Sequence, residues 1–313
     1  MNTKEELKML QALPLVVKVL KTKQRIKEWV EYYGLDDVYI SISGGKDSQV
    51  LLHIARQIYP DIKAVFINTG LEWNSVRQKG IDLADTVLVP EMNFVEVIKK
   101  YGYPVISKEV AQCIYEARKG LKNGKYQYRL DKLNGTYKNK NGELSTYQMT
   151  KYKPLLYAPF RISHMCCNVM KKRPSKKYKK NPIIGTMACE SSLRASNWIR
   201  NGCNSFNTKT PKSAPMSFWM EEDVIKYIEE NKLEIAKIYN AVSRTGCVFC
   251  LFGISYEKDK FITLKNNDRK KYDFVMNGGE FDEEGMWIPT REGLGYRFIL
   301  NWLNENMNLD IKY

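Results

Sequence analysis

Six consecutive residues, Ser43 to Ser48 (SGGKDS), combine features that bind phosphate groups. The two glycines let the backbone approach an anion without an intervening Cβ, and Lys46 adds a positive charge. Residues 39–42 have strand composition, and the apolar residues that follow the loop recur at helical spacing. The loop is therefore predicted to join a strand to a helix, and helix N-termini favour anions.

The spacing of this loop matches neither of two common nucleotide-binding motifs, GxxxxGK[ST] and GxGxxG. A simpler interpretation is a tight strand-to-helix turn that is capped by Asp47 or Ser48. The complete hexapeptide is unusual for such a turn, so a phosphate site is the favoured interpretation.

Four of the seven cysteines form a second chemical pattern. Cys166 and Cys167 are adjacent, Cys247 and Cys250 form a CxxC motif, and 79 residues separate the two pairs. A CxxC motif directs two thiolates at one metal centre, and a second pair completes four ligands. Adjacent cysteines suit a 4Fe–4S cluster better than one tetrahedral zinc ion, because their Cβ vectors diverge; zinc and buried structural thiols are the alternatives. The isolated cysteines are expected to be packing residues: Cys113, Cys189 and Cys203.

Alternating strand-like and helix-like segments predict the fold that positions these residues. The predicted strands are 37–42, 62–67, 86–89 and 182–187, with helices near 46–58, 74–85 and 93–101. This order is typical of an α/β fold with a mostly parallel, doubly wound sheet. Ligands of such sheets collect at the carboxyl ends of the strands, where the Ser43–Ser48 loop is expected to lie.

Three domains or segments are predicted along the chain. Residues 1–34 form a helical segment with an amphipathic helix from Leu15 to Tyr33, residues 35–253 form the nucleotide-binding α/β domain, and residues 254–313 form a helical region.

A basic insertion, residues 118–150, is predicted within the α/β domain. It contains Asn-Gly pairs at 123–124, 134–135 and 141–142, which favour turns, so two or three short hairpins are expected.

The overall composition is that of a soluble globular protein: 313 residues, of which 43% are apolar. No apolar run approaches 20 residues, and the N-terminus lacks the apolar core of a signal peptide. A cytoplasmic protein without a membrane span is therefore expected.

The formal net charge of +15 is concentrated in two runs. Residues 118–140 hold eight basic residues and one acid, Asp131, and seven of the ten residues 171–180 are basic. Four tyrosines are interleaved with or follow the first run: Tyr126, Tyr128, Tyr137 and Tyr147. Solvated surface is one interpretation, but a polyanion such as tRNA or DNA fits this mixture of cations and aromatic rings better.

The hexapeptide SGGKDS resembles the PP-loop of the ATP-pyrophosphatase superfamily, which is adenine nucleotide alpha-hydrolase-like. Its continuation resembles the phosphoadenosine phosphosulfate (PAPS) reductase family, which includes sulfonucleotide reductases and DndC-like DNA-sulfur-modifying proteins. The matching segments are VFINTGLEW (65–73), YGYPVISKEV (101–110), CCNVMKKRP (166–174), IIGTMACESSLRA (183–195), WMEEDVIKYI (219–228) and RTGCVFCLFG (244–253).

This resemblance implies an ATP site and a 4Fe–4S cluster held by the four paired cysteines. The implied nucleotide-binding residues are Ser43, Gly44, Gly45, Lys46, Asp47, Ser48, Asn68, Thr69, Glu72, Gly185, Thr186, Glu190, Arg194 and Arg244. Lys46 and Ser48 would neutralise phosphate charge during catalysis, and Asp47 would hold Mg²⁺ or position the loop.

The chain departs from the sulfonucleotide reductases at its C-terminal end. Those enzymes carry a catalytic cysteine in a short C-terminal motif, whereas no cysteine follows Cys250 here and the tail FILNWLNENMNLDIKY has neither Cys nor His. Reductases also tend to depart from SGGKDS, which this chain keeps in full.

The favoured hypothesis is an enzyme that cleaves ATP to AMP and pyrophosphate, activates an acceptor, and transfers sulfur with a 4Fe–4S cluster and a sulfur donor protein. The first alternative is a PAPS or adenylyl-sulfate reductase whose thiol comes from a partner. The second is a non-catalytic nucleotide- or nucleic-acid-binding module.

Overall fold

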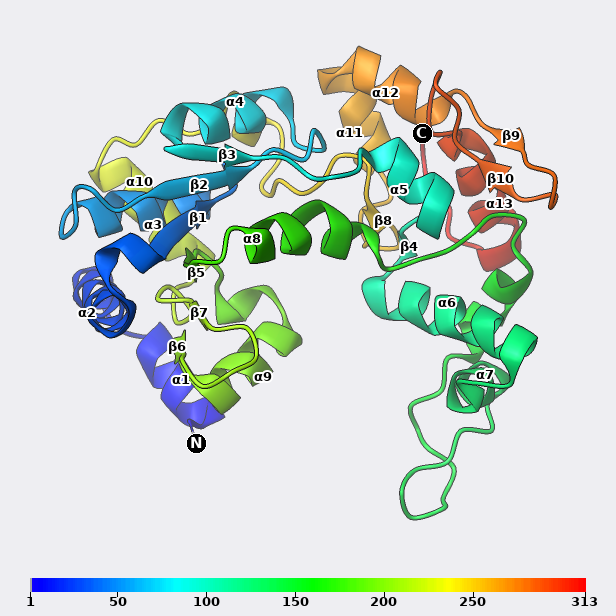
Figure 1. Cartoon of the computed structure of the whole chain (residues 1–313), viewed down its shortest axis with the longest axis horizontal. Coiled ribbons are helices and arrows are strands. Elements are labelled where there is room, and N and C mark those ends of the chain that lie inside the picture. Colours follow the sequence, from blue (N-terminus) through cyan, green and yellow to red (C-terminus); the bar gives the residue numbers. More distant parts are fainter. Residues whose placement is uncertain (1) are drawn as a thin grey trace. The chain divides into compact units, whose positions relative to one another are not determined.

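The computed structural model describes residues 2–313, which form two compact units (Figure 1). Unit 1 contains the chain up to Pro90 together with Arg173–Thr245, and unit 2 contains Glu91–Lys172 and Gly246–Tyr313. The domain boundaries that were expected near residues 34 and 253 are not those of the compact units, because each unit is built from two separate stretches of chain.

Unit 1 is an α/β unit around one sheet, in agreement with the predicted fold class. Its elements are α1 (Lys4–Gln11), α2 (Leu15–Tyr33), η1 (Leu35–Asp37), β1 (Val38–Ile42), α3 (Lys46–Arg56), β2 (Ala64–Ile67), α4 (Asn74–Leu83), β3 (Thr86–Leu88), α8 (Arg173–Lys177), β5 (Asn181–Ile184), η4 (Ala188–Glu190), α9 (Ser192–Asn201), β6 (Asn204–Ser205), β7 (Lys212–Ser213), α10 (Glu221–Glu230) and η5 (Lys237–Asn240). Predicted strands and helices up to β3 agree with these bounds to within a few residues, and α2 ends at Gly34 as expected.

The sheet has the strand order β3-β2-β1-β5-β7-β6, and its pairs are parallel except for β6 with β7. The chain moves from β1 outward to β2 and β3, and then returns to add β5 on the other side of β1. The strand order therefore reverses between β1 and β5. In open parallel sheets, ligands bind beyond the strand ends at such a switch point.

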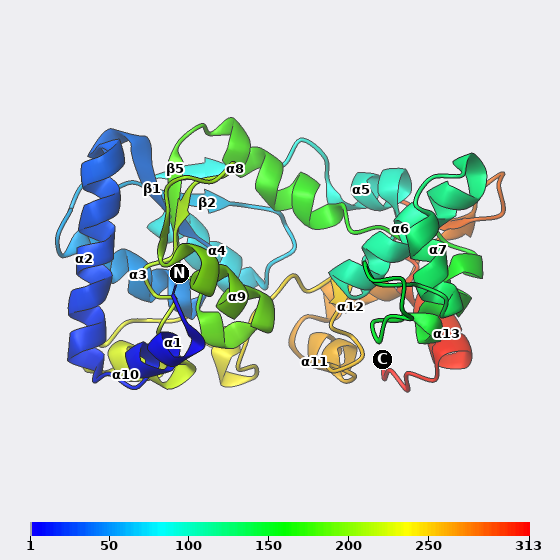
Figure 2. The same ribbon diagram turned by 90° about the horizontal axis from the view of Figure 1, so that it is seen from below.

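Helix α2 packs against β1 and α3, and Figures 1 and 2 both show it along this side of unit 1. Trp29 on α2 is fully buried in the core, as is Trp219, whose indole N–H donates to Thr22 Oγ1 over 2.9 Å. A buried ion pair joins Lys18 Nζ to Asp223 Oδ2 at 2.5 Å. These contacts attach the N-terminal helix to the elements that surround the strand ends.

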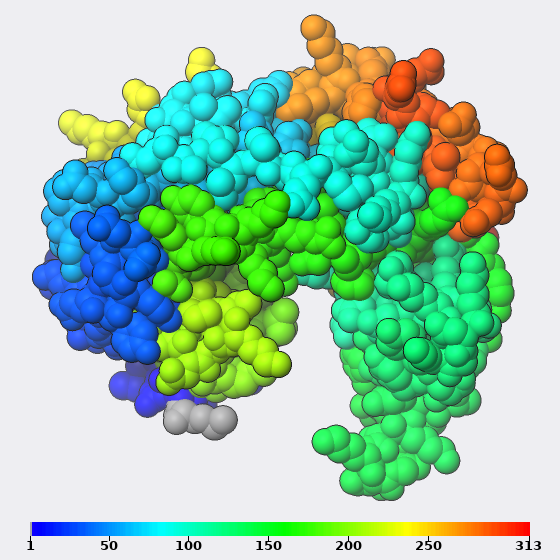
Figure 3. Space-filling view, viewed as in Figure 1, coloured from blue at the N-terminus to red at the C-terminus, as the bar shows by residue number. Residues whose placement is uncertain are grey.

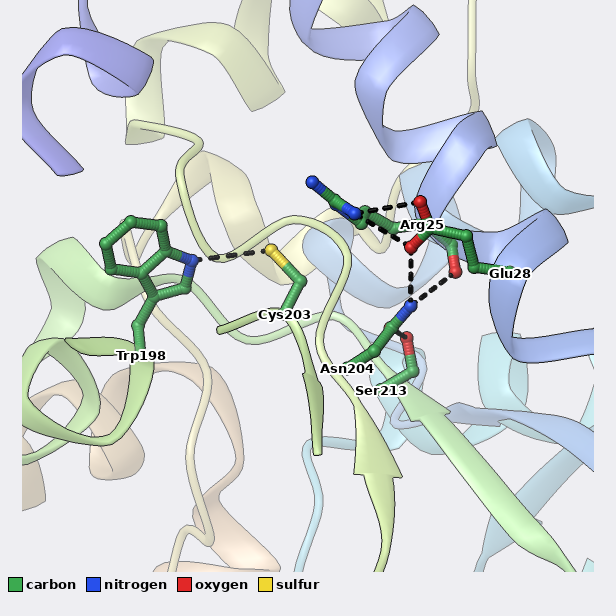
Figure 4. A network of polar contacts seen from close by, with 6 residues as sticks. All are labelled: Arg25, Glu28, Trp198, Cys203, Asn204 and Ser213. Atoms are coloured by element: carbon green, nitrogen blue, oxygen red, sulfur yellow. Dashed lines mark hydrogen bonds and ion pairs between the residues drawn. The ribbon is translucent and has the colours of Figure 1, made fainter. Parts of the chain in front are cut away.

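The antiparallel β6–β7 edge is attached to α2 by polar contacts (Figure 4). Asn204 donates to the carbonyl of Arg25 and to Glu28 Oε2, and Ser213 donates to Asn204 Oδ1 over 2.7 Å. Beside this network the indole N–H of Trp198 donates to the buried Sγ of Cys203.

Unit 2 is mainly helical. Its elements are α5 (Phe94–Tyr101), β4 (Val105–Ile106), α6 (Lys108–Asn123), α7 (Gln127–Asn134), η2 (Thr150–Tyr157), η3 (Asn168–Lys172), β8 (Leu251–Phe252), α11 (Lys260–Asn267), α12 (Arg269–Met276), β9 (Glu280–Phe281), β10 (Trp287–Ile288) and α13 (Tyr296–Met307). The C-terminal stretch is helical as predicted, with a short antiparallel β9–β10 pair added.

The expectation of two or three hairpins within residues 118–150 is wrong for most of this segment. Gly124 and Gly135, both in the left-handed conformation, are the C-caps of α6 and α7. Asn-Gly pairs serve as helix ends as readily as hairpin turns, because both require a positive φ. One hairpin does form, around Gly142, where Lys138 pairs with Leu144.

Candidate nucleotide loop and cysteine cluster

The Ser43–Ser48 loop lies between the end of β1 and the first turn of α3, as predicted. Its two serines close it: the Ser43 N–H donates to Ser48 Oγ over 3.1 Å, and the Ser48 hydroxyl donates to the Gly45 carbonyl over 2.9 Å. The Gly45 N–H reaches Ser43 Oγ at 3.3 Å. The loop thus keeps its shape through its own hydrogen bonds.

Gly44 is required by the fold as well as by any ligand. It has φ of +73°, and a Cβ there would lie 2.0 Å from the Val76 carbonyl oxygen of α4. A Cβ on Gly45 would meet the Tyr239 hydroxyl at 3.0 Å. Neither position tolerates a side chain without movement of its neighbours.

Lys46 is largely buried and already has anionic and polar partners. Its Nζ donates to Glu221 Oε1 over 2.6 Å and to the Ser243 carbonyl over 3.1 Å, and its backbone N–H donates to the Tyr239 hydroxyl over 3.0 Å. The hydrogen bond from Lys46 lowers the pKa of Glu221, which remains ionised. Arg244 Nη2 lies 3.9 Å from the other oxygen of the same carboxylate.

Asp47 carries a buried oxygen, Oδ1, that has no hydrogen-bond partner among residues 2–313. Desolvation raises the pKa of this carboxyl, and the positive charges of Lys46, Arg244 and Arg194 oppose the rise. Gly185, directly after β5, packs on the same turn, since a Cβ there would lie 3.0 Å from the Asp47 carbonyl oxygen. The ends of β1 and β5 therefore meet at the switch point, with three cations near them.

The other residues that were predicted to bind the nucleotide differ in their exposure and in their hydrogen-bond partners. Thr69 and Glu72 are buried, and the Thr69 hydroxyl donates to Glu72 Oε1 over 2.6 Å. Arg77 donates to Asn68 Oδ1 over 2.9 Å.

Glu190 caps η4 by accepting from the Met187 N–H at 2.7 Å, and it also forms an ion pair with Arg194. Thr186 is half-buried directly after Gly185. A role of Asn68, Thr69, Glu72, Thr186 and Glu190 in nucleotide binding stays a prediction.

Sequence reasoning missed Tyr239 and Glu221, the two residues that contact the Lys46 main chain and side chain. They lie 193 and 175 residues away along the chain, so no local spacing could connect them with the loop. Glu221 does fall within the WMEEDVIKYI segment, which already carried the family resemblance.

The four paired cysteines all lie in unit 2, and short strands bring their segments together. β4 pairs with β8, which directly follows Cys250, and Tyr103 just before β4 bridges to Ile162, which precedes the adjacent pair. Sγ of Cys166 lies 3.9 Å from Sγ of Cys167.

Each of the other three thiols contributes to the raised pKa of Cys166, with the hydrogen bond to Cys167 as the first cause. The same hydrogen bond lowers the pKa of Cys167 to about 6, and desolvation raises that of Cys250 to about 11.

The CxxC turn is held by its surroundings. Lys260 Nζ donates to the carbonyls of Cys247 and Cys250 at 3.2 and 2.7 Å, and the buried Tyr296 hydroxyl donates to Phe249 O over 2.6 Å. Four cysteines from two segments are the donor set that a 4Fe–4S cluster requires. Within residues 2–313, no three His, Cys, Asp or Glu side chains are arranged to hold a metal ion, so the cluster stays a prediction.

The isolated cysteines differ from one another. Cys113 and Cys203 are buried, which confirms their packing role, but Cys189 is exposed, so the same expectation was wrong for it. Cys189 lies on η4, which follows β5, and its thiol lies 3.4 Å from the Trp219 carbonyl oxygen. Desolvation raises its pKa, and Arg244 opposes the rise.

The chain is similar in sequence to curated reductases of two staphylococcal species. Adenosine 5′-phosphosulfate reductases from Staphylococcus epidermidis and Staphylococcus haemolyticus are each 26% identical to this chain, over 74% of it and 76% of the relative. A phosphoadenylyl-sulfate (PAPS) reductase structure from Candida auris in a phosphate complex covers 77% of this chain and 93% of its own, with 12% identity and a TM-score of 0.38, which is too low to inform the site.

No helix within residues 2–313 has the length and apolar character that crossing a membrane requires. The phosphoadenosine phosphosulfate reductase domain matches residues 37–140 and 121–251, and the chain belongs to this family.

Proposed function

We propose that this protein is a sulfonucleotide reductase that binds adenosine 5′-phosphosulfate, or its 3′-phosphorylated form, at the Ser43–Ser48 loop. The observation that carries the proposal is the meeting of this loop with Gly185 at the sheet's switch point, beside Lys46, Arg194 and Arg244. The names of the staphylococcal relatives support this substrate class.

The cations around the loop are already paired with carboxylates, so an anionic ligand would bind by replacing a carboxylate as their counter-ion. Lys46 and Arg244 share one carboxylate, Glu221, while Arg194 is paired with Glu190. A phosphosulfate that enters between Lys46 and Arg244 takes the place of Glu221 as their counter-ion. Glu221 is a third exposed, so it can move into solvent when the nucleotide binds.

The reduction needs two thiols. A thiolate attacks the sulfur of the phosphosulfate, an S–S bond forms, the bond from sulfur to the phosphate oxygen breaks, and AMP (adenosine 3′,5′-bisphosphate from the 3′-phosphorylated substrate) leaves with the electron pair. A second thiolate then attacks the first thiol's sulfur, releasing sulfite and leaving a disulfide. The cations at the loop stabilise the AMP phosphate as its charge develops.

We expect a partner dithiol protein to supply these thiols, because four of the seven cysteines form the paired set and Cys113 and Cys203 are buried. Among residues 2–313, Cys189 is the cysteine that is exposed as a residue, but partial desolvation of its sulfur raises the pKa of the thiol and so reduces the thiolate fraction. Replacing it by serine should therefore leave sulfite formation unchanged when the dithiol partner is present.

The family also suggests a resident 4Fe–4S cluster, and the cysteine donor set fits it. Cys166, Cys167, Cys247 and Cys250 would hold it, and it would supply iron sites and inorganic sulfide. This chain's part is to fix the CxxC turn through Lys260 and Tyr296.

A second candidate, ATP cleavage coupled to sulfur transfer, is favoured by two sequence observations. The chain keeps the complete SGGKDS loop and lacks the C-terminal thiol. In that reaction an acceptor attacks the α-phosphate, pyrophosphate leaves, and Asp47 holds Mg²⁺ or positions the loop while Lys46 and Ser48 stabilise the phosphates.

The two candidates are separated by incubating anaerobic protein with a thioredoxin-type dithiol and either adenosine 5′-phosphosulfate, its 3′-phosphorylated form, or ATP. The proposal predicts sulfite from a sulfonucleotide at about 1 per second or faster. Pyrophosphate release from ATP without sulfite would replace it by the second candidate. If neither sulfite nor pyrophosphate forms, both candidate functions are overturned.

A further inference from the structure

Seven exposed lysines lie on one segment of unit 2, and we refer to them as the lysine face. They are Lys119, Lys122, Lys125, Lys138, Lys140, Lys151 and Lys153. The segment 119–153 contains two acids, Asp131 and Glu143. Within residues 2–313, none of the seven lysines lies in an ion pair with a carboxylate.

Other basic residues of the same stretch have structural roles and do not belong to this face. Arg118 is half-buried, and its guanidinium donates to four main-chain carbonyls, those of Leu155, Leu156, Ala158 and Phe160. Arg129 is paired with Glu116 at 2.7 Å. The fold therefore compensates the charges that it buries and leaves the lysine face without counter-ions from the protein.

The lysine face spans elements that pack on one another within unit 2. α6, α7 and η2 are in mutual contact, and the Met149 N–H donates to the Lys132 carbonyl of α7 over 2.8 Å, which fixes the base of the hairpin. Lys132 Nζ also lies over the rings of Tyr137 and Tyr147, at 4.7 and 4.5 Å from their centroids. Figures 1 and 3 show the hairpin projecting past α7.

Aromatic rings are exposed among these lysines. Tyr126 and Tyr128 at the start of α7 are 39% and 42% exposed, Tyr147 after the hairpin is 46% exposed, and Tyr157 at the end of η2 is 73% exposed. Lys119 and Lys151 lie over the rings of Tyr115 and Tyr152, at 4.4 and 4.8 Å from their centroids. Large rings half-open to solvent beside cations without carboxylate partners are the combination with which proteins stack nucleobases and neutralise phosphates.

The chemistry of this face favours one class of partner. A small anion needs two or three cations in a concave site, whereas these seven lysines are spread over two helices and a hairpin. An anionic membrane would be matched by clustered apolar side chains, but the exposed leucines, Leu121 and Leu144, lie singly on α6 and on the hairpin. Uncompensated charge of one sign also repels itself, which a polyanion relieves.

We infer that the lysine face binds single-stranded nucleic acid, with the lysines on phosphates and the tyrosines on bases. This activity goes beyond the proposed reductase chemistry, because its residues lie in unit 2 and the nucleotide loop lies in unit 1. A test of nucleic-acid binding is therefore independent of a test of sulfite formation.

Fluorescence anisotropy with a labelled 20-nucleotide dT strand, the matching RNA strand and a DNA duplex tests the inference across a salt series. The K119Q/K122Q/K125Q variant should bind the single strands about tenfold more weakly at low salt, and its log–log salt slope should be shallower by about 2, at about 0.7 for each lost phosphate contact. Tyr126→Leu should weaken binding about fivefold or more and leave the slope unchanged.

The matched control is K4Q/K8Q/K27Q, which removes the same charge from exposed positions on α1 and α2 of unit 1. It should bind like the wild type, and both triple variants should form sulfite at the wild-type rate. Equal losses in the two triple variants would show a non-specific charge effect and overturn the inference. Tighter binding to the duplex than to the strands, or to phosphatidylglycerol vesicles with none to oligonucleotides, would also overturn it.

Discussion

The nucleotide loop of unit 1 and the cysteine cluster of unit 2 are built in opposite ways. The loop is held by its own serines and glycines, and its cation Lys46 already has a protein counter-ion. The cysteines come together from two segments, but the hydrogen bond to Cys167 raises the pKa of Cys166, and desolvation raises that of Cys250. Within residues 2–313 they form no ready metal site.

This difference teaches what each site needs from its occupant. A loop for a nucleotide that comes and goes must keep its shape when empty, so the fold supplies every contact that shapes it. The proposed 4Fe–4S cluster would help to complete its own site, because its binding would replace the protons of the four thiols. Loss of the occupant should therefore harm unit 2 far more than unit 1.

The largest expected effect is in unit 2. Cys250→Ser should remove the iron of anaerobically purified protein, from about four atoms per chain to almost none, because one of four cluster ligands is lost. Iron analysis and the visible absorption spectrum measure this, with Cys113→Ser as the control at a buried cysteine outside the quartet. Colourless wild-type protein that contains one zinc ion would contradict the proposed 4Fe–4S cluster and its contrast with the loop.

The next effect concerns the shape of the loop. Gly44→Ala should destabilise the protein by about 2 kcal/mol or more, since it adds a Cβ at positive φ and 2.0 Å from the Val76 carbonyl oxygen. Gly34→Ala is the matched control in unit 1: its φ is also positive, at +87°, but its Cβ would meet nothing within 4 Å. Urea unfolding compares the two, and equal losses would mean that contact with α4 does not constrain the loop.

A smaller, opposed pair of effects is expected at the Lys46–Glu221 ion pair. Lys46→Ala should weaken nucleotide binding about tenfold or more, because a charge-assisted phosphate contact is lost. Glu221→Gln should instead strengthen binding a few-fold, since the competing carboxylate charge is gone. Titration calorimetry with adenosine 5′-phosphosulfate measures both, and weaker binding in Glu221→Gln would show that Glu221 assists the nucleotide.

The smallest effect is the pH dependence of Asp47. Its pKa in the folded protein is raised above its usual 3.8, so the folded state binds the proton more tightly and ionisation at higher pH costs stability. Asp47→Asn should therefore raise the melting temperature slightly at pH 7, and this gain should disappear as the pH falls toward 4. A gain that is independent of pH would contradict this account.

The loop and the core of the sheet could be predicted from the sequence because their signals are local. A glycine pair after a β-branched strand, and apolar residues at helical spacing, specify a strand–loop–helix unit without reference to the rest of the chain. The N-terminal helix, which the sequence placed at roughly Leu15 to Tyr33 with Gly34 after it, was confirmed for the same reason.

Other features depend on the tertiary fold. Tyr239 and Glu221 reach Lys46 from far along the chain, and the exposure of Cys189 on η4 had no local signal in the sequence. Gly124 and Gly135 show a different limit: an Asn-Gly pair requires a positive φ but does not specify whether a helix ends or a hairpin turns.

The central claim, that a sulfonucleotide is reduced at the Ser43–Ser48 loop, is tested most directly by sulfite release from radiolabelled adenosine 5′-phosphosulfate at subsaturating concentration. Wild-type protein, the Lys46→Ala variant and the Cys189→Ser variant are compared anaerobically with the same dithiol partner. We predict sulfite from the wild type and from Cys189→Ser at equal rates, and a rate about tenfold or more lower from Lys46→Ala. Sulfite release that is unchanged in Lys46→Ala, or absent from the wild type, would contradict the claim.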